Sequence, residues 1–394
     1  MQKKNIMPVV IAAVVALSIA AVLGGCEGQN KPSSQPESSS RSQPANQPAQ
    51  PEKKPVTDAK IHHVASYGEE LGENTIWCAP MELCWNEAME INGGPLGNAD
   101  NATKQSLNEK PFDKTYLADD HYYNYAKVVE DPQKTTDEIN AALKEKFGQT
   151  SDLLTGSEGN PGALFFYSML YRKFAYATPF AMLDKAPFAV SLEGAAEKDI
   201  AYFGVNEDMG TPEMAEQITV LYYSGDERHA VMIDTVEGDR VIFVKGPEAG
   251  SAKEIFETAM AQASGYDGSR DLGRDEMFKA PVVSIDVEDD FATLKGASLV
   301  YEGDKQVVDE AKQKTKLMLD NEGGEVKSEA YMSLKATSMP THEIRNFVYD
   351  DAYAIFIIDG SATANATALE NGNYTALKPY LAARVNSAAL FQQG

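Results

Sequence analysis

The chain has 394 residues, with 35 Lys or Arg against 59 Asp or Glu, so its formal net charge at pH 7 is −24. Such an excess of acidic residues argues against nucleic acids and anionic lipid surfaces as partners of the folded part. The five histidines show no metal-ligand spacing, and neither a Gly-rich phosphate loop nor a Gly-x-Ser-x-Gly motif occurs, so we expect no enzymatic activity, no metal and no cofactor.

The first residues do not have the composition of a folded domain. An apolar run over residues 7–23 follows two lysines and ends in two glycines before Cys26, the layout of a signal peptide. Small residues directly before a cysteine resemble the bacterial lipobox, which implies that residues 1–25 are removed and Cys26 is lipidated. A transmembrane anchor and an ordinary cleaved signal are the alternatives.

The next segment, residues 26–57, is rich in Ser, Pro and Gln and nearly lacks apolar residues, which is typical of a disordered tether. One folded domain is then expected over residues 58–394. These features together predict a lipoprotein held on the cell membrane by its lipid anchor and facing the exterior.

The domain begins with a predicted short helix over residues 64–71. A strand and a buried helix follow, because Pro80 can open a helix and Gly93 can close it. The apolar residues at helical spacing are Met81, Cys84, Trp85, Ala88 and Met89. For Cys78 and Cys84 we favour two free thiols over a disulfide, because the chain between them does not ensure the required Cα separation.

Residues 98–135 are polar and tyrosine-rich and carry little pattern. Ile139, Leu143 and Phe147 lie four apart, which predicts a helix. The apolar run over residues 163–176 suits a strand buried on both faces.

Four strands are predicted next, over residues 200–205, 218–223, 230–236 and 240–245. The turn at residues 237–239 joins the last two as a hairpin. Ser251 and Glu254 form a capping-box pattern ahead of a helix. Such a mixture of strands and helices indicates an α+β domain.

Residues 347–360 predict a buried strand, and residues 380–385 a final one. Before the first of these strands, small or apolar side chains alternate with mostly polar ones over residues 324–335, which is a strand pattern. This pattern continues into residues 336–343, which have the composition of an exposed loop.

Several of these segments resemble serpins, in the order of that family. The segments that are similar to serpin segments are the strand and helix around Pro80, INAALKEKFGQTSDLL, ALFFYSMLYRKFAYA with TPF and KAPFAVS after it, FVYDDAYAIF, and LAARVNSA near the end. The resemblance covers nearly the whole domain. It implies an α+β serpin-like fold, with large mixed β-sheets, surrounding helices and an exposed reactive loop.

The resemblance also implies a function. In inhibitory serpins a protease cleaves the reactive loop, and the N-terminal part of the loop inserts as a strand into the central sheet with the protease trapped. The segment NEGGE matches the family's hinge, which implies that the hinge residues are Glu322, Gly323, Gly324 and Glu325. The residues that would enter the sheet facing inward are Val326, Ser328, Ala330 and Met332.

The family's usual spacing from the hinge implies a scissile bond between Thr337 and Ser338, within a region that also includes Leu334, Lys335 and Ala336. Lys335 at the reactive position would favour a trypsin-like protease. Ala336 or Thr337 would favour an elastase-like or subtilisin-like enzyme. The implied partner is a serine protease or, alternatively, a cysteine protease, and the inhibitor is expected to be a monomer.

The chain also departs from the family. Gln313 stands in place of a histidine that helps the sheet open, Tyr176 replaces a tryptophan, and residues 98–135 look too short for the usual helices and strand. Lys327 and Glu329 are larger than the hinge residues of inhibitory members. The alternative hypothesis is therefore a non-inhibitory serpin-fold binding protein on the cell surface.

Overall fold

The computed structural model describes residues 61–188, 198–323, 344–386 and 391. Contacts divide the chain into Met1–Pro51 and Glu52–Gly394, and every described residue belongs to the second unit. The predicted signal peptide and tether lie outside the described residues. In the part that is described, no helix is both long enough and apolar enough to span a bilayer.

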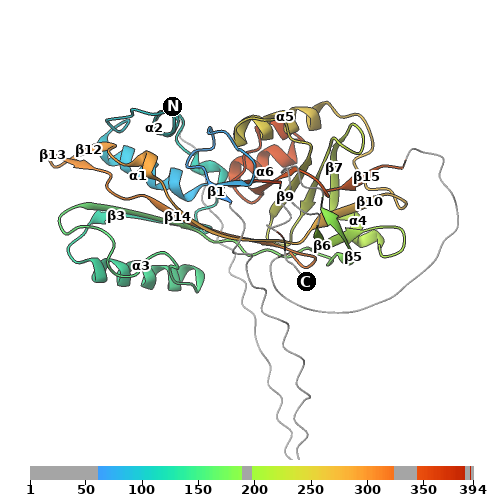
Figure 1. The fold of residues 1–394 in the computed structure, drawn as a ribbon, viewed down its shortest axis with the longest axis horizontal. Helices are drawn as coiled ribbons and strands as arrows, with labels where there is room; N and C mark the ends of the chain where they lie inside the picture. The colour runs from blue at the N-terminus through green and yellow to red at the C-terminus, as the bar shows by residue number, and fades with distance from the viewer. Residues whose placement is uncertain (1–60, 189–197, 324–343, 387–390, 392–394) are drawn as a thin grey trace, which may run out of the picture. The chain divides into compact units, whose positions relative to one another are not determined.

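Two larger sheets share the main hydrophobic core (Figure 1). The first has seven strands in the order β1-β2-β17-β16-β9-β8-β7. They are β1 (His62–His63), β2 (Thr75–Cys78), β17 (Leu381–Val385), β16 (Tyr353–Asp359), β9 (Asp239–Lys245), β8 (His229–Asp234) and β7 (Ile218–Tyr223). Every residue of β16 is buried, as expected for an apolar strand with a neighbour on each side.

The second sheet has four strands in the order β15-β10-β6-β5. They are β15 (Asn346–Val348), β10 (Met277–Pro281), β6 (Lys198–Val205) and β5 (Ala181–Phe188). The rings of Phe243 on β9 and Phe278 on β10 lie 5.8 Å apart in a T-shaped contact, so aromatic side chains join the two sheets.

The remaining strands form separate two-stranded ladders among the described residues. These are β3 (Tyr122–Val128) with β4 (Leu164–Leu170), β11 (Val283–Asp290) with β14 (Lys312–Leu319), and β12 (Ser298–Tyr301) with β13 (Asp304–Val307). All three ladders are antiparallel.

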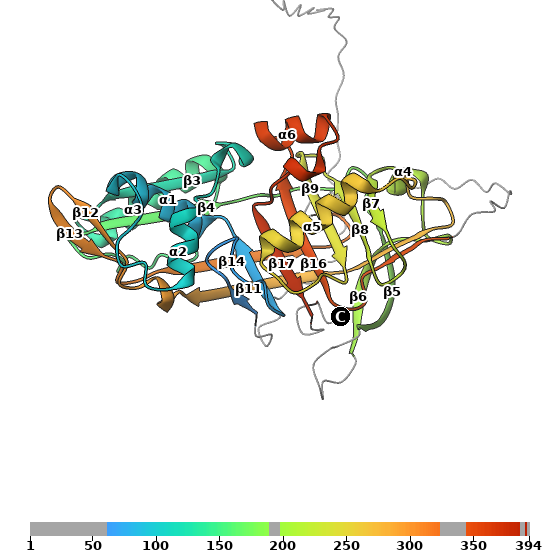
Figure 2. The ribbon, with the colours of Figure 1, turned by 90° about the horizontal axis from the view of Figure 1, so that it is seen from above.

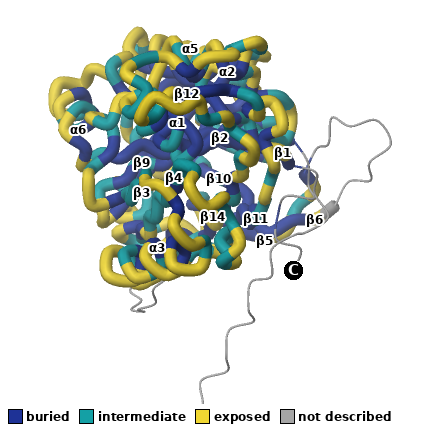
Figure 3. Tube along the Cα trace, turned by 90° about the vertical axis from the view of Figure 1, so that its left-hand side faces the viewer, coloured by how far each residue is buried: buried dark blue, intermediate teal, exposed yellow. Residues whose placement is uncertain are grey.

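Helices pack on the outside of these sheets, and Figure 3 shows exposed residues along them while strand β9 is buried. The helices are α1 (Pro80–Asn92), α2 (Ala102–Glu109), α3 (Pro132–Phe147), α4 (Pro212–Glu216), α5 (Ala252–Gly265) and α6 (Thr363–Glu370), with 3-10 turns at η1 (Lys114–Tyr116), η2 (Ala292–Leu294) and η3 (Tyr374–Ala376). Helix α5 covers the seven-stranded sheet, where Phe256 lies 5.0 Å from Phe356 (Figure 2).

Several predicted elements are confirmed. Helix α1 has Pro80 in its first turn and ends at Gly93, whose φ is +74°, and the Ser251–Glu254 capping box opens α5. The four predicted strands from β6 to β9 are present, and so are α3 and β17.

The helix predicted over residues 64–71 is wrong, because the segment forms turns instead. The side chain of Glu69 accepts hydrogen bonds from the amides of Ala65 at 2.8 Å and Ser66 at 2.9 Å. A carboxylate that binds nearby backbone amides in this way favours a turn over a helix.

Residues 98–135, which looked too short for the usual helices and strand, contain one α-helix, α2, and one strand, β3. Two further predictions need correction. Strand β4 is not buried on both faces, because only Tyr167 is buried and the other six residues are half-buried. Residues 347–360 contribute to two strands in different sheets, β15 and β16, and not to one.

Candidate functional site

Strand β14 lies directly before the predicted hinge, and its buried and more exposed side chains alternate. The buried residues are Gln313, Thr315, Leu317 and Leu319. Its antiparallel partner β11 places acidic residues opposite the lysines on the other face, in the pairs Lys312–Asp290, Lys314–Glu288 and Lys316–Asp286. Opposite charges across a ladder contribute ~0.2–1 kcal/mol per pair, so β11 and β14 are stabilised as a unit.

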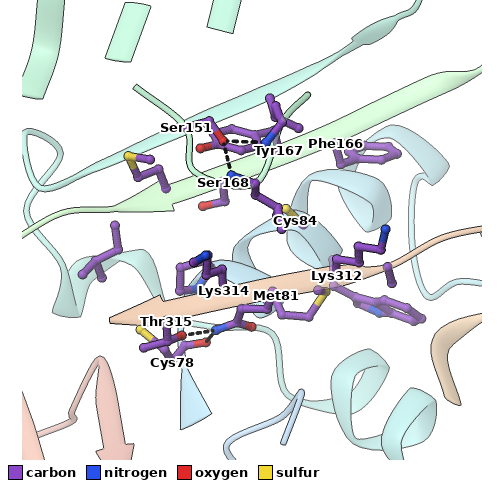
Figure 4. Close-up of a pocket in the computed structure, with 18 of the residues that line it drawn as sticks. Cys78, Met81, Cys84, Ser151, Phe166, Tyr167, Ser168, Lys312, Lys314 and Thr315 are labelled. Atoms are coloured by element: carbon purple, nitrogen blue, oxygen red, sulfur yellow. Dashed lines mark hydrogen bonds between the residues drawn. The ribbon is translucent and has the colours of Figure 1, made fainter. Parts of the chain in front are cut away.

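Strand β4 pairs with β3 along one edge, and a cavity of about 590 Å³ separates it from β14 (Figure 4). We call this space the inter-strand cavity. Met81, Cys84 and Trp85 of α1 line it between the two strands. Within the described residues, β4 and β14 therefore each have one edge that pairs with no other strand.

Backbone hydrogen bonds close one end of this arrangement. The amide of Tyr176 donates to the carbonyl of Glu322 at 3.1 Å, and the amide of Phe180 donates to the carbonyl of Asn321 at 2.8 Å. Tyr176, which replaces the family's tryptophan, is buried, and its ring makes a T-shaped contact with that of Phe180 at 4.9 Å. The segment after β4 thus contacts the predicted hinge.

Gly323 is required by the geometry of this contact. Its φ is +99°, and a Cβ at this position would lie 2.6 Å from the Cα of Ala175. No other residue fits without moving the backbone. Glu322 and Gly323 therefore lie in the turn that follows β14, whereas Gly324 and Glu325 lie outside the described residues. The hinge role of all four residues stays a prediction.

The other predicted loop residues are also outside the described residues. They are the inward-facing residues Val326, Ser328, Ala330 and Met332 and the scissile region Leu334, Lys335, Ala336, Thr337 and Ser338. Their roles stay predictions.

A chain of hydrogen bonds crosses the inner side of β11 and β14. His63 Nδ1 lies 2.9 Å from Asp289 Oδ2, and His63 Nε2 lies 2.9 Å from Thr315 Oγ1. The amide nitrogen of Gln313 donates to Thr315 Oγ1 and to the carbonyl of Cys78, both at 3.3 Å (Figure 4). Burial lowers the pKa of His63, which favours the neutral imidazole that these hydrogen bonds require.

The sequence did not predict these contacts, since it showed only that the five histidines, His63 among them, lack metal-ligand spacing. Asp289 and Thr315 are 226 and 252 residues away from His63 in the sequence. No local pattern could join positions so far apart. Gln313 was singled out only because it replaces the family's histidine.

Both cysteines next to the cavity are free thiols, as predicted. Burial raises the pKa of Cys78 and of Cys84 to about 12. The thiolate is the nucleophilic form of cysteine, so neither residue has the ionisation state of a catalytic cysteine near neutral pH.

Glu82 lies in the first turn of α1 and is buried. Its carboxylate accepts a hydrogen bond from the amide of Tyr67 at 2.5 Å. Burial raises the pKa of Glu82 to about 7, and hydrogen bonding to Tyr67 opposes this shift. This carboxyl therefore changes charge near neutral pH.

The chain that follows the predicted reactive loop is held by Arg345. The guanidinium binds Glu276 through two hydrogen bonds of 2.6 and 2.7 Å, the bidentate geometry that suits a carboxylate. Its other donors bind the Tyr266 hydroxyl at 2.9 Å and the carbonyls of Ser269 and Asp271 at 2.7 and 2.9 Å. The predicted loop is thus anchored at its C-terminal end as well.

The segment after α3 lies beside the cavity on the side opposite α1. Lys316 Nζ lies 2.5 Å from Asp152 Oδ2, which joins this segment to β14. Helix α3 itself packs on β3 and β4 through Ile139, Tyr125 and Tyr167.

Among the described residues, no group of three or more His, Cys, Asp or Glu side chains could hold a metal ion. His229 is fully buried among aromatic rings, with Tyr349 at 5.1 Å, and burial lowers its pKa to about 4. This histidine packs in the core.

Neither a family model nor a curated protein matches this chain. Solved structures do. A tumour-suppressing serpin matches with a TM-score of 0.50 and 9% identity over 80% of this chain and 93% of its own. Native protease nexin-1 with heparin matches with a TM-score of 0.49 and 11% identity, over 81% and 93% of the two chains. Human thyroxine-binding globulin with thyroxine matches with a TM-score of 0.45 and 12% identity, over 81% and 92%.

At such identities the similarity concerns the fold and not the activity. The mixed sheets with surrounding helices confirm the α+β prediction, and the chain has the serpin fold.

Proposed function

We propose that this protein is a serpin-type inhibitor of serine proteases, with cysteine proteases as the alternative target class. Cleavage of its reactive loop would be followed by insertion of the loop's N-terminal part between β4 and β14. The observation that carries this proposal is the inter-strand cavity, which lies between the unpaired edges of β4 and β14. Strand addition of this kind is known for serpins, and a new strand would pair with both edges.

The turn after β14 supports a particular register for that strand. Asp320 and Gly323 form an antiparallel bridge. If this register continues along β14, each loop residue that is predicted to face inward lies opposite a residue on the inner side of the β14 segment. The pairs are Leu317 with Val326, Thr315 with Ser328, Gln313 with Ala330, and Ala311 with Met332.

The same register has consequences for the outer face. Glu329 would lie opposite Lys314, a favourable pair, and Lys327 would lie opposite Lys316, an unfavourable one. Asp152, which contacts Lys316 at 2.5 Å, offsets part of that repulsion. The large side chains near the hinge are therefore compatible with insertion, because they face solvent.

For the target, we propose a protease of the trypsin, elastase or subtilisin type. Lys335 supports a trypsin-like enzyme, whereas Ala336 or Thr337 supports an enzyme with a small primary pocket. We further propose that the inhibitor is a monomer and acts at the exterior of the cell membrane, anchored by lipid at Cys26.

The second candidate is a non-inhibitory serpin-fold binding protein at the cell surface. Gln313 supports it, because its amide is already bonded to Thr315 and Cys78 where the family has a histidine that helps the sheet open. In that case the loop would be cleaved without insertion.

One experiment separates the two candidates. The unit Glu52–Gly394 is incubated with trypsin-, elastase- and subtilisin-like proteases and analysed on denaturing gels. An inhibitor gives an SDS-resistant complex with one of them. Cleavage near residues 334–338 without a complex and without a rise in thermal stability rejects insertion and leaves the binding protein.

A matched pair of variants tests the register. Ala330→Arg would place an unpaired charge on the buried face, at a cost of several kcal/mol, so complex formation is expected to fail. Glu329→Arg introduces the same side chain on the solvent face, where repulsion from Lys314 amounts to ~1 kcal/mol or less, so the complex is expected to persist. Equal behaviour of the two variants would contradict the register.

A further inference from the structure

The inter-strand cavity has an apolar wall formed by helix α1 and the segments next to it. Met81, Trp85 and Ala88 of α1 line this wall, and the ring of Phe166 on β4 also lines the cavity. The cavity volume of about 590 Å³ lies inside the range of about 300–1,000 Å³ that small-molecule sites occupy. Size and lining therefore suit a small molecule with aromatic rings.

Two buried polar atoms at this cavity have no hydrogen-bond partner among the described residues. Gln313 lines the cavity and is 4% exposed, and no described residue donates a hydrogen bond to its Oε1. Ser168 Oγ, on the opposite strand, is also buried and without a partner among the described residues. Leaving a buried acceptor unpaired is unfavourable, so Oε1 favours a ligand that brings a donor.

The neighbours of Gln313 fix which of its atoms faces the ligand. Asp289 can only accept, so His63 carries its proton on Nδ1 and its Nε2 accepts from the Thr315 hydroxyl. The Thr315 oxygen is then left to accept, and so is the carbonyl of Cys78. Both contacts require the NH₂ group of Gln313, so its Oε1 must be the free atom.

The charged residues at the edge of the cavity already have partners. Lys312 pairs with Glu310, Lys316 with Asp152 at 2.5 Å, and Arg172 with Asp239 at 2.5 Å. Lys314, which also lines the cavity, lies 3.8 Å from both Asp286 and Glu288. Each of these four cations is already paired with a carboxylate, which favours an uncharged ligand.

We propose that the inter-strand cavity is a binding site for a small, uncharged, aromatic molecule that donates one N–H or O–H hydrogen bond to Gln313 Oε1. The molecule packs against Trp85 and Phe166. Because the same space receives the inserted strand, a bound molecule slows inhibition. This last consequence rests on the proposed function, whereas the binding site does not.

The test compares two fluorescent probes on the unit Glu52–Gly394 without any protease. N-phenyl-1-naphthylamine is aromatic and uncharged and has one N–H group, and N-methyl-N-phenyl-1-naphthylamine lacks that N–H. We expect saturable one-to-one binding of the first probe, about tenfold tighter than that of the second, from one hydrogen bond.

Variants assign the preference to the cavity. Gln313→Leu is expected to bind both probes equally. Gln217→Leu is the matched control, since Gln217 is also buried but lies outside the cavity lining and bonds to Thr178. It should keep the preference. Ala88→Leu fills part of the apolar wall and should weaken both probes, which gives a second test if Gln313→Leu does not fold.

The proposal is overturned if binding does not saturate, if the two probes bind wild-type protein equally, or if Ala88→Leu binds both as wild type does. These outcomes leave the inhibitor proposal intact, because no protease is present. Conversely, saturable probe binding by a protein that forms no SDS-resistant complex rejects inhibition alone. When both proposals hold, saturating N-phenyl-1-naphthylamine slows complex formation.

Discussion

The buried carboxyl of Glu82 gives a prediction whose magnitude follows from the structure. Burial raises its pKa from the ordinary 4.5 to about 7. This difference corresponds to ~3 kcal/mol between the protonated and ionised forms of the folded protein. Replacing Glu82 with Gln keeps an acceptor for the Tyr67 amide and removes the charge.

The sign follows from the two pKa values. Below pH 4.5 the carboxyl is protonated in both the folded and the unfolded protein. As pH rises above 4.5 the carboxyl ionises more readily in the unfolded protein than in the folded one, which lowers the free energy of unfolding. The stability that Glu82 contributes is therefore full below pH 4.5 and is lost as pH rises through about 7. Glu82→Gln should match wild type near pH 4.5 and exceed it by ~3 kcal/mol near pH 8.

Urea unfolding followed by tryptophan fluorescence measures this difference at several pH values. His63 and His229 titrate in the opposite sense, since their lowered pKa values remove stability as pH falls, so only the difference between variant and wild type isolates Glu82. Glu70→Gln makes the same substitution at an exposed position and is the matched control. Parallel pH profiles for wild type and Glu82→Gln would refute the reasoning.

Three other predictions concern the hinge, the loop anchor and the thiols. Gly323→Ala should lower the unfolding temperature and expose the predicted hinge to proteolysis, because the added Cβ would lie 2.6 Å from the Cα of Ala175. Gly265→Ala, which has open space around it, is the control and should be neutral or stabilising. Arg345→Ala should destabilise by ~2–3 kcal/mol in urea unfolding, since it removes the guanidinium that binds the buried Glu276 carboxylate through two hydrogen bonds; a loss below ~1 kcal/mol would contradict the anchoring role. Cys78 and Cys84, with pKa values of about 12, should react with a thiol reagent far more slowly in folded than in urea-unfolded protein; equal rates would show that they are accessible.

Elements with strong local signals were predictable from the sequence. The apolar run of β16, the proline and glycine that delimit α1, and the capping box of α5 each indicate their element without knowledge of the fold. Strand β3 gave no such signal, because Tyr125 alone of its seven residues is buried. The hairpin β12–β13 was missed for a similar reason, since Val300 and Val307 are exposed.

The candidate site was predictable only in part. The segment around Gly323 predicts a turn, and the positive φ of this glycine gives the physical reason for the turn, whereas its role as a hinge stays a prediction. The inter-strand cavity and the contacts of His63 were not predictable, because they depend on strands that are distant in sequence and on which edges remain unpaired. Alternation along a strand indicates which side chains share a face but not which strands are neighbours.

Hydrogen exchange before and after cleavage by a cognate protease tests loop insertion most directly. The amides on the facing edges of β4 (residues 164–170) and β14 (residues 312–319) should exchange markedly more slowly in the cleaved protein, because a new strand pairs with both edges. Strand β3, which already pairs with β4, should change little. Unchanged exchange in β4 and β14 of a fully cleaved protein would contradict insertion.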